Sequence, residues 1–90
     1  MTGTTRSSAG LDARRRRLLS RCWHRGTREM DLIMGRFADA HLAGFDAAEL
    51  EAFEAIVELP DIELYQWLTG RVAVPETHDT PMLRRIRDAT

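Results

Sequence analysis

The apolar side chains of this 90-residue chain recur at helical spacing along most of its length. They return every three or four residues, which places them on one face of a helix. The short run VAV at residues 72–74 is too brief to indicate a strand. The sequence therefore predicts an all-α fold, a single small bundle of about five helices.

Length and composition restrict what such a bundle can contain. A chain of 90 residues makes one small domain, and a domain of this size buries only about 60% of its unfolded surface, which leaves little volume for a deep catalytic pocket. The single cysteine excludes an internal disulfide and a cysteine-rich zinc site. No apolar stretch approaches the ~18 residues of a membrane span, so we expect no membrane insertion.

The chain divides into a short leader and one domain. Residues 1–10, MTGTTRSSAG, are small and polar, which predicts a disordered leader before a helical domain over residues 11–90. The leader has no apolar core, which excludes a secretory signal. Its acid-free composition weakly resembles a mitochondrial presequence, but a frayed terminus is the preferred interpretation.

Capping residues predict where the helices begin and end. Four side chains have the character of helix N-caps: Asp12, Thr27, Asp46 and Thr80. Three glycines are expected to end helices: Gly26, Gly44 and Gly70. A fourth helix is expected over residues 61–69, after Pro60, and residues 71–79 are expected to form a loop.

The formal net charge of −1 conceals a strong sorting of charge along the chain. Residues 1–28 carry eight Arg and one Asp, residues 29–79 carry two Arg and twelve acids, and residues 80–90 carry three Arg and one Asp. One helical stripe of arginine suits carboxylate or phosphate clamping: Arg14, Arg17, Arg21 and Arg25. The acidic segment would repel a phosphate backbone. We therefore expect the arginine stripe to bind an acidic patch, on a partner or on the chain's own helices, rather than nucleic acid.

No residue pattern predicts catalysis or a metal site. The three histidines stand at no metal-ligand spacing from one another or from Cys22. Cys22 falls on the apolar stripe of the first helix and is expected to be a small core residue. The sequence also contains no phosphate-binding glycine loop and no nucleophile elbow. We therefore expect no independent enzyme.

The segment Arg25-Gly26-Thr27-Arg28-Glu29 is the most unusual local feature. It puts a glycine between two helices, with charged residues on both sides. A plain helix–turn–helix corner that needs Gly26 for positive φ is one interpretation. The other is a docking site, because backbone amides and charges converge there on the surface.

The run RLLSRCWHRGTREMDLIMGRFAD, residues 17–39, resembles the hallmark segment of the succinate dehydrogenase assembly factors. Their Arg-Gly-x-x-Glu signature corresponds to Arg25, Gly26 and Glu29, and its longer form extends to Asp31, with Met30 in place of leucine. The stretch LPDIELYQWLTG at residues 59–70 and the ending MLRRIRD are also similar to this family. The resemblance covers about residues 14–88.

This resemblance implies a five-helix chaperone that binds the flavoprotein subunit of succinate dehydrogenase and promotes covalent attachment of FAD to it. It leaves fumarate reductase open as a second client. It implies no tightly bound cofactor, since the partner and FAD supply the chemistry. A cytoplasmic location is expected, with the mitochondrial matrix as the alternative. A helical adaptor for another acidic protein and, less favoured, a nucleic-acid-binding protein are the other functions left open.

The resemblance also implies which residues bind the partner. Five are expected at the interface: Arg25, Gly26, Arg28, Glu29 and Asp31. The arginines would pair with carboxylates of the partner, the acids with its basic groups, and the glycine would let the backbones approach. Tyr65 and Trp67 are expected either at the interface, where they could stack on a flavin, or in the core, which is preferred.

Overall fold

The computed structural model describes residues 10–90. It contains α1 (Ala13–Trp23), α2 (Arg28–His41), α3 (Ala47–Val57), α4 (Asp61–Leu68) and α5 (Pro81–Ala89), with two 3₁₀ turns, η1 (Leu42–Gly44) and η2 (Glu76–His78). No strand occurs in these residues, so the predicted all-α bundle of five helices is confirmed. Most of the expected disordered leader lies outside the described residues, and the domain boundary stays a prediction.

The expected capping residues begin four of the five helices. The carboxylates of Asp12 and Asp46 accept backbone N–H bonds from three residues further on, at 2.7 and 2.8 Å. The hydroxyls of Thr27 and Thr80 do the same at 3.3 and 3.2 Å. The backbone N–H of Asp46 donates a 2.9 Å hydrogen bond to the carboxylate of Glu49, which completes a capping box. These local signals therefore place the helix starts correctly.

Two tight turns depart from the expected boundaries. Helix α2 ends at His41 rather than at Gly44, because residues 42–44 wind into η1, where the N–H of Phe45 bonds to the carbonyl of Leu42. The segment expected as a loop contains η2, where the N–H of His78 bonds to the carbonyl of Pro75. Such short 3₁₀ pieces are frequent at helix ends and in connections.

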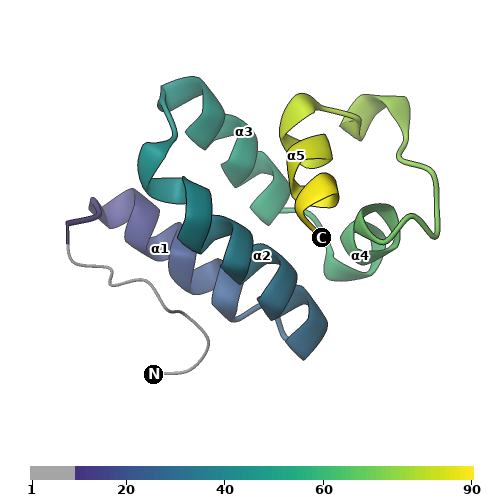
Figure 1. Cartoon of the computed structure of the whole chain (residues 1–90), viewed down its shortest axis with the longest axis horizontal. Coiled ribbons are helices and arrows are strands. Elements are labelled where there is room, and N and C mark those ends of the chain that lie inside the picture. Colours follow the sequence, from purple (N-terminus) through teal and green to yellow (C-terminus); the bar gives the residue numbers. More distant parts are fainter. Residues whose placement is uncertain (1–9) are drawn as a thin grey trace.

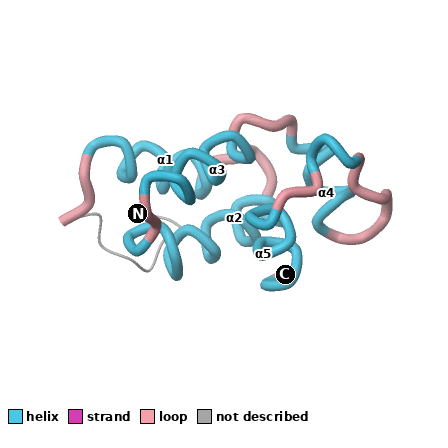
Figure 2. Tube along the Cα trace, turned by 90° about the horizontal axis from the view of Figure 1, so that it is seen from above, coloured by secondary structure: helices cyan, strands magenta, loops and turns pink. Residues whose placement is uncertain are grey.

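The helices form a flat bundle in which α1 lies beside α2 (Figure 1). Seen from above, α1 and α3 run along one side, α2 and α5 along the other, and α4 closes one end (Figure 2). Helix α5 packs on α2, α3 and α4, and every helix contributes to one apolar core. Fully buried members include Leu18, Met34, Phe53, Leu64 and Ile86. No helix of residues 10–90 is long and apolar enough to cross a membrane.

Cys22 lies in this core, as expected for a small apolar side chain. Burial raises the pKa of its thiol to about 12. The reactive form of cysteine is the thiolate, which is scarce at neutral pH when the pKa is this high. Cys22 is therefore a packing residue.

Helices α1 and α2 are in close contact where the ring of Trp23 lies against Gly35. A Cβ added at Gly35 would come within 2.3 Å of two ring atoms of Trp23. The indole Nε1 of Trp23 donates a 3.4 Å hydrogen bond to Asp39, also on α2. The missing side chain of Gly35 thus makes room for the ring, a role that was not apparent in the sequence.

The arginines of the first helix meet carboxylates of this same chain. Arg14 pairs with Glu54 of α3 at 2.6 Å, and Arg21 pairs with Glu58 at the end of α3 at 2.5 Å. The expectation that the arginine stripe faces an acidic patch on the chain's own helices is confirmed for these pairs. Basic residues of the first segment and acids of the second thus meet where α1 packs on α3.

Mild acid is expected to weaken the fold through two of these carboxylates. A hydrogen bond from Arg14 holds the pKa of Glu54 below its ordinary 4.5, and one from the backbone of Arg15 holds the pKa of Asp12 below 3.8. The unfolded chain binds these protons more readily, so their contribution is present above about pH 4.5 and is lost as the pH falls through the lower folded values. The loss should be small, because both groups are solvent-screened.

Urea unfolding followed by circular dichroism at pH 6 and pH 3 measures this effect. In Glu54→Gln the midpoint should fall less between the two pH values than in the wild type. Glu63→Gln removes an exposed carboxylate that makes no ion pair within residues 10–90 and serves as the control. Equal losses in all three proteins would contradict the assignment to Glu54.

Candidate functional site

The corner between α1 and α2 is built around Gly26. Its φ of +116° lies in a region that L side chains rarely adopt, which confirms the expected need for glycine. A Cβ added there would meet nothing within 4 Å, so packing within the chain does not require the glycine. The surface above Gly26 is open to an approaching partner.

Arg25 points inward from this corner. Its side chain is only 7% exposed, and its guanidinium donates to the carbonyls of Val57 and Leu59 at 2.5 and 2.8 Å. Its Nε also donates to the carboxylate of Asp61 at 2.7 Å. Arg25 therefore ties the corner to the junction between α3 and α4. Its pairing with a partner's carboxylate stays a prediction, but in the free chain that guanidinium is already bonded.

Asp31 also acts within the corner, whereas Arg28 and Glu29 face outward. The carboxylate of Asp31 accepts the backbone N–H of Arg25 at 2.6 Å, which holds the end of α1 against the first turn of α2. Arg28 and Glu29 are exposed and make no ion pair within residues 10–90. The motif thus combines two residues that shape the corner with two charges available to a partner.

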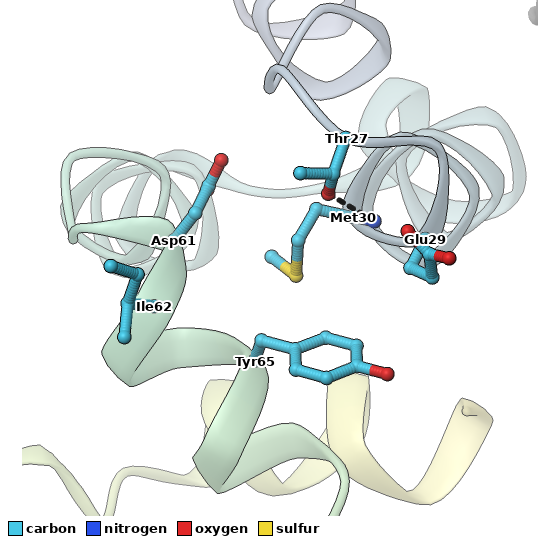
Figure 3. A pocket seen from close by; sticks show the side chains of 6 residues that line it. All are labelled: Thr27, Glu29, Met30, Asp61, Ile62 and Tyr65. Atoms are coloured by element: carbon cyan, nitrogen blue, oxygen red, sulfur yellow. Dashed lines mark hydrogen bonds between the residues drawn. The ribbon is translucent and has the colours of Figure 1, made fainter.

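Two hollows flank the corner. The corner hollow, of about 530 Å³, is lined by Trp23, His24, Gly26, Thr27, Arg28, Asp31 and Leu32. The α2–α4 groove, of about 270 Å³, is lined by Thr27, Glu29, Met30, Asp61, Ile62 and Tyr65 (Figure 3). Thr27 lines both, so the motif residues and the start of α4 form one continuous surface.

The two aromatic residues of α4 have different positions. Trp67 is buried, and its ring centroid lies 5.1 Å from that of His78. Tyr65 is half-buried, lines the α2–α4 groove and has the guanidinium of Arg71 over its ring at 5.4 Å. The preferred core assignment thus holds for Trp67, while Tyr65 has a face at the surface.

Sequence reasoning did not single out Ile62. This side chain is 77% exposed, directly beside the α2–α4 groove. A large apolar residue between the acids Asp61 and Glu63, opposite the apolar stripe of α4, was the available signal. Within residues 10–90, no group of three or more His, Cys, Asp or Glu side chains is placed to hold a metal ion.

The family model described as "Flavinator of succinate dehydrogenase" matches residues 16–90, which include the corner and the α2–α4 groove. The chain belongs to this family. It is 51% identical over 76 residues to the FAD assembly factor SdhE of Acetobacter pasteurianus, covering 84% of this chain and 70% of that protein. The resemblance seen in the motif is thereby confirmed.

Mitochondrial relatives match this chain at lower identity. The succinate dehydrogenase assembly factor 2 of Debaryomyces hansenii is 36% identical over 74 residues, which is 82% of this chain and 52% of that protein. Assembly factor 2-B of Drosophila ananassae is 31% identical over 85 residues, 92% of this chain and 52% of that protein. The chain spans about half the length of these two relatives. No solved structure matches it significantly.

Proposed function

We propose that this chain is an assembly factor that binds the flavoprotein subunit of succinate dehydrogenase and promotes covalent attachment of FAD to it. Membership of the flavinator family carries this proposal, because the match includes the whole corner. The geometry agrees with a docking role, since Gly26 leaves the corner open and Arg28 and Glu29 are unpaired within residues 10–90.

The proposed mechanism is positional and not enzymatic. The assembly factor would hold parts of the flavoprotein around bound FAD, so that the reacting groups meet in the correct orientation. Such a gain in proximity needs no catalytic group from the assembly factor. The cofactor and the partner would supply the bond-forming chemistry, and this chain would keep no FAD of its own.

Fumarate reductase is a second client that the same mechanism would serve, since only a similar flavoprotein surface is needed. The bacterial and the mitochondrial relatives give two candidate locations, of which we favour the cytoplasm over the mitochondrial matrix. A general adaptor for acidic proteins is less favoured, because Arg14 and Arg21 of α1, and Arg25 just after it, already bond to carboxylates of this chain.

Purification of the tagged chain from its own cells tests the proposed function. The flavoprotein subunit of succinate dehydrogenase should co-purify with it. On denaturing gels, that subunit should show strong fluorescence of covalently bound flavin when it comes from wild-type cells and little when it comes from cells lacking the chain. Equal flavin fluorescence in both would contradict the assembly role, and capture of an unrelated acidic protein would favour the adaptor.

A further inference from the structure

The bonds of Arg25 fix one side of the α2–α4 groove to the corner. Helix α4 packs against α5, while its first residue, Asp61, is fixed to the corner by the guanidinium of Arg25. The carbonyls of Val57 and Leu59 bind the same guanidinium, so the whole turn before α4 is anchored. Helix α4 consequently begins beside α2 without closing on it, and the groove lies between them.

The groove is apolar inside and acidic at its rim. Met30 lies between the two helices, with Ile62 on one side and the ring of Tyr65 below (Figure 3). Its lining includes two carboxylates and no cation. Asp61 is neutralised by Arg25, whereas Glu29 makes no ion pair within residues 10–90.

Size and exposure indicate what the groove can hold. Its volume of about 270 Å³ is close to that of the smallest small-molecule sites, ~300 Å³, and is enough for one large side chain. Ile62 stands beside it with 77% of its surface exposed. Ile62 is therefore continuous with the apolar lining of the groove, and an apolar patch with a polar rim is a surface that protein–protein contacts use.

We infer that the α2–α4 groove binds a segment of the flavoprotein partner that carries a bulky apolar side chain next to a lysine or arginine. The apolar side chain packs on Ile62 and Tyr65, above the buried Met30, and the cation pairs with Glu29. The inference rests on the proposed function and extends its interface from the corner to α4. Charge complementarity selects this occupant, because the one unpaired charge of the lining is a carboxylate.

Substitutions of Ile62 test the inference, since its exposure leaves the core untouched. The dissociation constant of each variant is measured with the purified flavoprotein subunit by isothermal titration. Ile62→Ser should weaken binding about tenfold, as expected for losing a buried apolar side chain. The matched control is Val72→Ser, because Val72 is the other large hydrophobic residue exposed in residues 10–90, at 44%. It should bind like the wild type.

The sign of the partner's charge is tested at the same position. Ile62→Lys should bind several-fold more weakly than Ile62→Asp at low salt, and the difference should shrink as salt is added. Wild-type affinity in Ile62→Ser, or tighter binding by Ile62→Lys than by Ile62→Asp, would overturn the inference. A dimer of the free chain that Ile62→Ser dissociates would overturn it too, by assigning the groove to a second copy. If the wild type itself fails to bind the flavoprotein, the proposed function fails first.

Discussion

Gly26→Arg is expected to abolish partner binding and flavin attachment while the bundle stays folded. At a φ of +116° an L residue is strained, and such strain costs about 1–3 kcal/mol, which is smaller than the ~5–15 kcal/mol that hold a domain together. The arginine side chain would occupy the corner hollow, which Gly26 lines and where we place the partner. Circular dichroism measures the fold, and in-gel flavin fluorescence of the flavoprotein measures the function.

Gly70 offers the matched control for this substitution. It also has a positive φ, +77°, and a Cβ there would likewise meet nothing within 4 Å, but it lies after the C-terminal end of α4. Gly70→Arg should retain flavin attachment, and Gly26→Ala shows what backbone strain does without a large side chain. Normal flavin fluorescence with a folded Gly26→Arg protein would contradict the proposal that the corner is a docking site.

Gly35→Ala is expected to destabilise the protein by about 2 kcal/mol, within the usual range for overpacking a core. The new Cβ would lie 2.3 Å from the ring of Trp23, so the indole must move or α1 must separate from α2. Alanine favours a helix over glycine by about 1 kcal/mol, which offsets part of this loss. The free energy of unfolding in urea, followed by circular dichroism, measures the net effect.

Gly44→Ala is the control for this prediction, because a Cβ at Gly44 meets nothing within 4 Å. Its stability should stay within about 0.5 kcal/mol of the wild type, as for other surface changes. Trp23→Leu should reduce the penalty of Gly35→Ala, since the two sites then no longer collide, and a double-mutant cycle measures that coupling. Additive losses would show that the collision is not the cause.

The parts of the fold that depend on near neighbours in sequence were predictable. A cap side chain and the N–H that it binds are three residues apart, so Asp12, Thr27, Asp46 and Thr80 could be recognised directly. The same holds for the positive φ of Gly26, which follows from a glycine between two amphipathic runs. The two 3₁₀ turns were not predicted, although the backbone bonds that define them also join residues three apart.

The parts that depend on distant residues were not predictable from one sequence. The partners of Arg25 lie 32–36 residues further along, so its role as an internal bridge could not be read from the motif. The need for glycine at position 35 could not be predicted either, because it comes from the contact with Trp23 in the folded chain. The α2–α4 groove combines two helices whose separation no local pattern specifies.

The ion pairs between α1 and α3 also bear on how this chain is synthesised. Arg14 leaves the ribosome 40 residues before Glu54, and Arg25 leaves 36 residues before Asp61. Until those acids are made, the α1–α2 segment has a net positive charge and apolar side chains that the rest of the core does not yet cover. The positive charge is neutralised only when α3 and the start of α4 have been made. The second half of the chain is therefore needed to complete the packing of the first.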